Sequence, residues 1–318
     1  MIIPKVKINF LDFWEGFDPQ NNFITRSLSQ FCTPIISNEP DFLFYSCFST
    51  GFLSRYPNAV RIYVSLENTH CNFNECDYAI GTENLTYSDR YLYFPPFYMS
   101  LDKEINNRYI PNTKRKFCNF IYSNEIMGQG AIERKKFCEQ LMKYKHVDCP
   151  GKVLNNMKAD SLSPRTSNQR SISKIKFISN YKFTIAWENT FGDYYVTEKL
   201  SEPLIAKSIP IYWGGESQIN KNSYISVTDY SNFDDLIAYI IELDNNEDLY
   251  NKILSQEPLP SNYNFDKERE LSTYLENIIV KGPHQRARDS VDKSTFALLR
   301  EKSIYQKLKT SFLKRLKN

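Results

Sequence analysis

Hydrophobic and polar positions alternate along this chain in two patterns, one typical of strands and the other of helices. Short runs rich in β-branched and aromatic residues predict strands, whereas apolar positions at helical spacing predict helices. The predicted strands lie within residues 5–10, 40–48, 61–66, 114–124, 183–187, 209–213 and 224–227, and the predicted helices within 24–31, 131–144, 232–243 and 262–280. This alternation is typical of an α/β protein whose parallel sheets are covered on both faces.

Residues 181–215 are the most informative segment, because they predict one complete β-α-β unit. A strand at 183–187 leads into a polar turn, and Thr197 is a suitable N-cap for the helix that follows. A second buried strand at 209–213 is ended by two glycines. Open α/β sheets bind ligands at the carboxyl ends of their strands, where helices begin. We therefore expect a ligand at this turn.

The turn and the helix start carry a dense group of polar side chains. They comprise two carboxylates, an amide, two tyrosines, a threonine and a lysine: Glu188, Glu198, Asn189, Tyr194, Tyr195, Thr197 and Lys199. A cation and amide groups beside a helix start suit an anionic ligand such as a diphosphate. By composition alone, Glu198 and Lys199 also fit an ordinary solvent-exposed first turn. Both interpretations stay open at this point.

Length and composition favour two domains. A chain of 318 residues can form two cores of about 150 residues each. A polar, Ser-rich stretch at 155–174 lacks periodicity and predicts an interdomain linker. We therefore expect domains at 1–155 and 156–290 and a separate tail at 291–318. No G-x-G-x-x-G sequence occurs in the chain, so a dinucleotide cofactor is not expected.

Charge, cysteines and histidines argue against several classes of protein. The net charge of +3 is too small to indicate nucleic-acid binding. The seven cysteines are odd in number and scattered, which argues against a disulfide framework, and neither they nor the three histidines have the spacing of a metal site. No signal peptide and no stretch of about 20 apolar residues is recognisable. We therefore expect a cytoplasmic protein.

The C-terminal tail carries a basic amphipathic pattern. Apolar residues between positions 304 and 317 recur at helical spacing, with lysines and an arginine around them. A helix of this kind can lie on an anionic membrane surface, which would place the protein peripherally on the inner face of the cytoplasmic membrane. It can equally pack on another domain or on a partner protein.

Three motifs within residues 181–215 resemble a known family. They are F-x-x-x-x-E-N from Phe183, Y-V-T-E-K from Tyr195 and I-P-I-Y-W-G from Ile209. In this order they resemble the donor-binding signature of the α-1,3/4-fucosyltransferases, glycosyltransferase family ten, of bacterial type. The resemblance implies a GT-B architecture, in which two Rossmann-like α/β domains face a central cleft. It also implies that the donor binds to the C-terminal domain and the acceptor to the N-terminal domain.

Motifs in the first half of the chain support the same resemblance. Glu67 and Asn68 follow a predicted strand, and D-Y-A-I-G from Asp77 and an aromatic tract at 90–98 come after them. The resemblance implies that Glu67 is the general base that deprotonates the acceptor hydroxyl. It further implies that Arg134, at the start of a helix, faces the nucleotide diphosphate. Without the resemblance, Arg134 fits a surface arginine beside two lysines.

The resemblance also implies a reaction, the inverting transfer of L-fucose from GDP-β-L-fucose to a GlcNAc-containing glycan of the N-acetyllactosamine type. It assigns Glu198 to stabilising the cationic transition state. It places the donor against five further residues near the same helix start: Asn189, Tyr195, Val196, Thr197 and Lys199. The chain contains no Asp-x-Asp motif. We therefore expect protein groups alone to hold the diphosphate, with no metal and no cofactor.

Some features are left open by the sequence. They are the natural acceptor, the choice between α-1,3 and α-1,4 linkage, the oligomeric state, and which of Tyr194 and Tyr195 contacts the donor. Two alternatives also remain, since the motifs specify the diphosphate better than the sugar. One is transfer of another nucleotide-linked deoxy-sugar, and the other is a catalytically silent relative that binds glycans.

Overall fold

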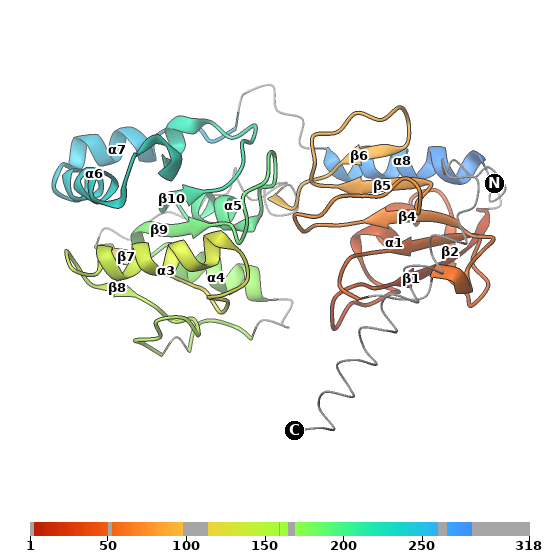
Figure 1. Cartoon of the computed structure of the whole chain (residues 1–318), viewed down its shortest axis with the longest axis horizontal. Helices are drawn as coiled ribbons and strands as arrows, with labels where there is room; N and C mark the ends of the chain where they lie inside the picture. Colours follow the sequence, from red (N-terminus) through yellow and green to blue (C-terminus); the bar gives the residue numbers. More distant parts are fainter. Residues whose placement is uncertain are drawn as a thin grey trace, which may run out of the picture. The chain divides into compact units, whose positions relative to one another are not determined.

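The protein consists of two α/β units, each built on one parallel sheet (Figure 1). The computed structural model describes residues 3–49, 53–97, 114–158, 160–164, 169–259 and 266–281. The first unit combines the residues before Pro95 with helix α8 (Lys267–Lys281), and the second unit comprises the residues between them. The predicted α/β class with two Rossmann-like sheets is confirmed.

The first unit contains a six-stranded sheet in the order β2-β1-β3-β4-β5-β6. Every neighbouring pair is parallel. The strands are β1 (Lys5–Leu11), β2 (Thr33–Ile36), β3 (Phe42–Tyr45), β4 (Val60–Val64), β5 (Tyr78–Gly81) and β6 (Tyr91–Tyr93). β3, β4 and β5 are buried along their whole lengths, as strands covered on both faces should be. A short helix, α1 (Phe23–Leu28), is capped by the side chain of Asn22.

Helix α8 belongs to the first unit, although its sequence position predicted that it would end the donor domain. Its buried residues Leu271, Leu275 and Ile278 join the same apolar core as α1. The hydroxyl of Ser272 donates to the carbonyl of Ser27 at 3.1 Å. The hydroxyl of Tyr274 donates to a carbonyl of β5 at 3.2 Å. The apolar stripe of α8 specified that the helix must be covered, but it could not specify which sheet would cover it.

The second unit contains a five-stranded parallel sheet in the order β11-β10-β9-β7-β8. Its strands are β7 (Lys116–Asn119), β8 (Val147–Asp148), β9 (Tyr181–Trp187), β10 (Ile209–Trp213) and β11 (Ile225–Ser226). Its helices are α3 (Gln129–Leu141), α4 (Arg170–Ile178), α5 (Glu198–Ile205), α6 (Phe233–Asn245) and α7 (Glu247–Leu254). The ring of Phe137 from α3 stacks on Trp187 of β9 and meets Phe233 of α6, which ties both helices to the centre of the sheet.

The boundary between the units lies at Pro95 and not near residue 155. β7 pairs with β9 in the second sheet, with Cys118 opposite Phe183. The polar stretch at 155–174 therefore lies inside the second unit, and its last five residues already belong to α4. Low apolar content indicated an exposed connection, but it could not distinguish a connection within a domain from one between domains.

The predicted amphipathic tail at 291–318 lies outside the described residues. Within the part of the chain that the structure describes, no helix combines the length and the apolar character needed to cross a membrane. Membrane contact by the tail therefore remains a prediction from the sequence.

A buried carboxylate fastens α6 to the second sheet and makes stability depend on pH. Asp244 accepts hydrogen bonds from Lys145 and Lys182, each at 2.7 Å. Burial opposes ionisation of Asp244, but these two ammonium groups outweigh it, so its pKa lies below the ordinary value of 3.8. A lowered folded-state pKa adds stability above the unfolded-state pKa, and this contribution is lost as the pH falls through the folded-state value.

We expect Asp244→Asn to lower the free energy of unfolding by about 1 to 3 kcal/mol at pH 7. We expect the difference between the variant and the original protein to shrink as the pH falls below about 4. Urea titrations at pH 7 and pH 3.5 measure both effects. Asp234→Asn, at the exposed start of the same helix, is the control. An equal loss at the two pH values would show that the carboxylate charge is not the cause.

Candidate functional site

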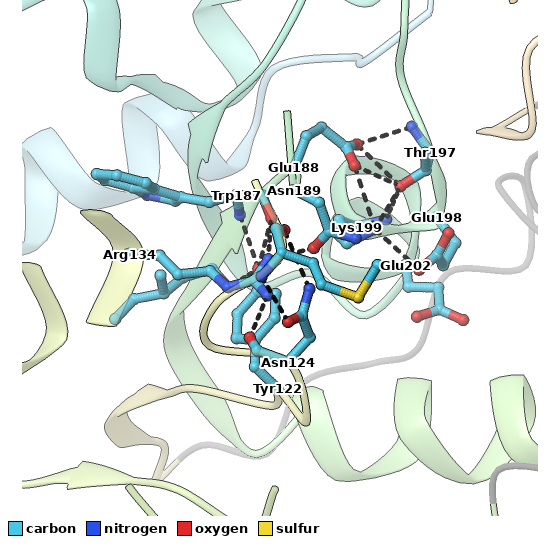
Figure 2. Close-up of polar contacts among 12 residues, drawn as sticks. Tyr122, Asn124, Arg134, Trp187, Glu188, Asn189, Thr197, Glu198, Lys199 and Glu202 are labelled. Atoms are coloured by element: carbon cyan, nitrogen blue, oxygen red, sulfur yellow. Dashed lines mark hydrogen bonds and ion pairs between the residues drawn. The ribbon is translucent and has the colours of Figure 1, made fainter. Parts of the chain in front are cut away.

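The site is built where β9 ends and α5 begins, and its central residue is Glu188. This side chain is 0% exposed. Its carboxylate accepts hydrogen bonds from the backbone N–H of Thr197 at 2.9 Å and from the Thr197 hydroxyl at 2.8 Å. Its other oxygen lies 3.2 Å from the ammonium nitrogen of Lys199 (Figure 2). Glu188 therefore connects the strand end to the first turn of α5.

Lys199 lies between two carboxylates. Its ammonium nitrogen is 3.2 Å from Glu188 and 3.5 Å from Glu198, and its side chain is only 16% exposed. Burial lowers the pKa of Lys199, but the two carboxylates outweigh burial and raise it well above 10.5. The lysine therefore stays charged at neutral pH. The alternative of an ordinary solvent-exposed first turn is therefore wrong for Lys199.

Glu198 is the more accessible of the two carboxylates, with 43% of its side chain exposed. Burial raises the pKa of Glu198, but the positive charges of Lys199 and Lys174 outweigh burial and lower this pKa below 4.5. For Glu188, burial is the stronger effect, and its pKa lies above 4.5. The site therefore contains one ionised carboxylate that solvent can reach, Glu198, and one buried carboxylate, Glu188, that contacts Thr197 and Lys199.

A second ion pair supports α5 from α4. The ammonium nitrogen of Lys174 lies 2.6 Å from the buried carboxylate of Glu202. The other carboxylate oxygen of Glu202 accepts a hydrogen bond from the hydroxyl of Ser171 at 2.8 Å. Because Lys174 also lowers the pKa of Glu198, its charge acts on the first turn of α5.

Arg134 lies beneath the same loop and is 1% exposed. Its guanidinium donates to the side-chain oxygen of Asn189 at 2.8 Å, to the carbonyl of Trp187 at 3.1 Å and to the carbonyl of Asn124 at 2.6 Å. It also lies 3.7 Å from the centre of the Tyr122 ring (Figure 2). The structure therefore brings Arg134 and Asn189 into direct contact, and the alternative of a surface arginine is wrong.

Two glycines allow α3 to approach the loop closely. Gly128, at the start of α3, has a φ of +95°, which L side chains rarely adopt. A Cβ on Gly128 would lie 2.2 Å from the carbonyl oxygen of Asn189, and one on Gly130 would lie 2.1 Å from that of Glu188. The backbone N–H of Gly130 donates to the carbonyl of Asn189 at 2.9 Å. These contacts hold the start of α3, and so Arg134, against the end of β9.

The other residues predicted to contact the sugar donor lie in the turn before α5 and at its start. Thr197 is the N-cap of α5 and accepts from the backbone N–H of Lys199 at 3.3 Å. Tyr195 and Val196 are buried, and the Val196 carbonyl accepts from the backbone of Phe97 at 3.3 Å. Tyr194 has a φ of +65° and is partly exposed.

Glu67, the predicted general base, lies in the first unit, in the loop that follows β4. Its backbone N–H donates to the Ser65 hydroxyl at 3.2 Å, and its carbonyl accepts from the Thr82 hydroxyl at 3.2 Å. The hydroxyls of Ser65 and Thr69 lie 2.6 Å apart. Hydroxyl groups thus fix this loop at the carboxyl end of the sheet, where catalytic groups of parallel sheets are placed.

Sequence reasoning missed several parts of this site. Glu188 was recognised as a polar residue of the turn but was given no role. Lys174 was placed in a linker, and Tyr122 and Asn124 were treated only as the end of a strand. The E-N pair directly after a buried strand was the available signal for Glu188. Nothing in the local sequence indicates that Tyr122 lies under Arg134, because they approach only when β7 and α3 pack on β9.

Two family models match the chain and together span most of it. The Alpha-(1,3)-fucosyltransferase FucT N-terminal domain matches residues 8–100, and the Glycosyltransferase family 10 (fucosyltransferase) C-terminal domain matches residues 110–257. The chain belongs to glycosyltransferase family 10. The two matches meet near the boundary between the two units, which agrees with the observed division.

Curated relatives of this family 10 protein include the alpha-(1,3)-fucosyltransferase FucT of Helicobacter pylori, which is 30% identical over 304 residues. That alignment covers 80% of this chain and 61% of the relative. The putative fucosyltransferase R654 of Acanthamoeba polyphaga mimivirus is 34% identical over 222 residues, covering 67% of this chain and 36% of the relative. The chain therefore spans less than two thirds of the length of these relatives.

Solved structures similar to this family 10 protein include an alpha1,3-fucosyltransferase with GDP, at 26% identity and a TM-score of 0.72. The similarity covers 91% of this chain and 94% of that chain. An alpha1,3-fucosyltransferase with GDP-fucose aligns at 27% identity with a TM-score of 0.68, covering 86% of this chain and 91% of the other. Both units therefore share the architecture of these enzymes.

Proposed function

We propose that this protein is an inverting α-1,3-fucosyltransferase that transfers L-fucose from GDP-β-L-fucose to a hydroxyl of a GlcNAc-containing glycan. The observation that supports it most directly is the group at the end of β9. In a chain of family 10, Lys199, Arg134 and the N-terminus of α5 converge there with an ionised Glu198. Cations and a helix N-terminus are what a leaving diphosphate requires.

The donor is supported by a comparison across relatives. Alpha-(1,3)-fucosyltransferases match this chain, and so do proteins named GDP-fucose protein O-fucosyltransferase 3, which are 31% to 36% identical over 122 to 125 residues in Xenopus laevis and Homo sapiens. These names differ in the acceptor and share fucose transfer. We therefore assign GDP-fucose as donor with more support than any particular glycan acceptor.

In the proposed mechanism each unit supplies a different charge. Glu67 of the first unit takes the proton from the acceptor hydroxyl, which then attacks the fucose carbon that carries the diphosphate. Lys199 and Arg134 stabilise the negative charge that develops on the departing GDP. Glu198 stabilises the positive charge that develops on the fucose ring. Attack from the face opposite GDP gives inversion.

We propose that no metal takes part, because buried protein cations already occupy the role that a divalent ion fills in many glycosyltransferases. The chain lacks the Asp-x-Asp motif. Assays with GDP-fucose and a panel of disaccharides, with and without EDTA, test donor, acceptor and metal dependence together. Proton NMR of the product determines the linkage and the anomeric configuration. Loss of activity in EDTA that is restored by a divalent ion would contradict the metal-independent mechanism.

The proposal assigns Glu188 a measurable effect on Lys199. In Glu188→Gln the buried ammonium loses one of the two carboxylates that raise its pKa. We therefore expect GDP affinity to fall at a lower pH in the variant than in the original protein, where Lys199 stays protonated beyond pH 10. GDP titrations between pH 7 and pH 10 measure this shift. Glu216→Gln, which alters an exposed pair with Lys221, is the control. Identical pH profiles would contradict the role.

A further inference from the structure

A cluster of aromatic side chains lies at the carboxyl edge of the first sheet, outside the site described above. Four rings from the loops after β1 and β3 form it, Phe13, Trp14, Phe17 and Phe48, and Phe10 of β1 meets two of them, Phe17 at 5.1 Å and Phe13 at 5.5 Å. The Phe13 and Phe17 rings stack with centroids 4.2 Å apart, Trp14 meets Phe17 edge-on at 5.1 Å, and Trp14 meets Phe48 at 5.9 Å. We call this group the aromatic platform. Phe48 is 46% exposed and the other three are partly exposed.

The loops that carry the platform are fastened to each other. The backbone N–H of Phe48 donates to the carbonyl of Asp12 at 3.0 Å, and the hydroxyl of Ser49 donates to the Asp12 carboxylate at 2.8 Å. Gly16 has a φ of +82°, which turns the first loop back after Trp14. The platform is therefore held by the fold, and polar groups lie at its border.

The platform and Glu67 share one edge of one sheet. β1, β3 and β4 are parallel neighbours, so the loops after Leu11, Tyr45 and Val64 all leave from the same edge of the sheet. Contacts connect the last two of these loops. The Cys47 sulfur lies 3.6 Å from the Ser65 hydroxyl, which in turn accepts from the backbone N–H of Glu67.

We propose that the aromatic platform binds the acceptor by stacking on the apolar C–H face of one of the acceptor's sugar rings. This inference rests on the proposed fucosyltransferase function. Aromatic faces contact sugar rings in this way, while neighbouring polar groups bind the hydroxyls. An exposed aromatic cluster that is rimmed by polar groups is also typical of a binding surface. Its position within the unit that holds Glu67 assigns it to the acceptor and not to the nucleotide.

Steady-state kinetics with N-acetyllactosamine and GDP-fucose test this assignment in the full chain. Phe48→Ala and Trp14→Ala should each raise the acceptor KM by about fivefold or more, and Trp14→Phe should restore most of the loss. The KM for GDP-fucose should change less than twofold. Tyr87→Ala, an aromatic of the same unit that packs on Phe73, is the control. Thermal melting establishes that each variant is folded.

A lower melting temperature with an unchanged acceptor KM would show that the platform is only packing, and would overturn the proposal. A raised donor KM would show that the rings bind the nucleotide, and would also overturn it. Saturation-transfer NMR with a panel of disaccharides separates this inference from the proposed reaction. Sugar contact that is lost in Phe48→Ala supports the platform even if no fucose is transferred, whereas no contact with any sugar in the original protein overturns it.

Discussion

Glu67→Gln is expected to reduce kcat for fucose transfer by roughly 10²- to 10⁴-fold, the contribution of a general base. The amide keeps the size of the side chain and cannot accept the acceptor proton. Its loop should stay in place, because the hydroxyls of Ser65 and Thr82 bind the backbone of Glu67. Affinity for GDP should change less than twofold, since the base has no role in holding the nucleotide. Kinetics and calorimetric GDP titration measure the two quantities.

The matched control for this prediction is Glu75→Gln. Glu75 lies later in the same connection between β4 and β5 and accepts a hydrogen bond from Asn72 at 3.1 Å. It should retain full activity. If Glu67→Gln transferred fucose at the original rate, another group would have to take the proton, and the assignment of Glu67 would fail.

Lys199→Ala is expected to weaken GDP binding by about 1.5 to 3 kcal/mol, the range for a hydrogen bond to a charged group. This corresponds to a rise in Kd of about 10- to 150-fold. The alanine also leaves the buried carboxylate of Glu188 without its ammonium neighbour, so some loss of stability should accompany it. Calorimetric titration with GDP at pH 7 gives the affinity, and a melting curve confirms that the variant is folded.

Two further variants make the Lys199 prediction specific. Lys199→Arg retains the positive charge and should recover part of the affinity. Lys221→Ala removes a lysine of the same unit that pairs with Glu216 on the surface, and it should bind GDP normally. If Lys199→Ala bound GDP as tightly as the original protein does, Lys199 would have only a structural role in the first turn of α5.

The strongest predictions from the sequence were those that depend on local pattern. The strand predicted at 183–187 is observed at Tyr181–Trp187, and the polar turn after it and the helix capped by Thr197 are observed as predicted. Alternation of apolar positions and a suitable cap determine such elements without help from distant residues. The very short strands β8 and β11 carry too few residues for a pattern, so β8 was missed and β11 was predicted too long.

The burial of Arg134 could not be predicted from its local sequence. Its neighbours Lys135 and Lys136 pair with glutamates on the surface, as their sequence suggests. Arg134 lies on the opposite side of the same helix and is enclosed by Tyr122, Asn124 and the end of β9. Only the family resemblance separated the three basic residues, because their local sequence contexts are almost the same.

By itself, the sequence determined the α/β class, the order of most elements and the location of the polar turn after β9. The periodicity of apolar residues and the turn chemistry carry that information within a few residues. Only the tertiary structure decided that α8 returns to the first sheet, that the boundary lies at Pro95, and that Glu188 and Lys199 form a buried pair. These features depend on which distant surfaces bury one another, and no local pattern specifies that choice.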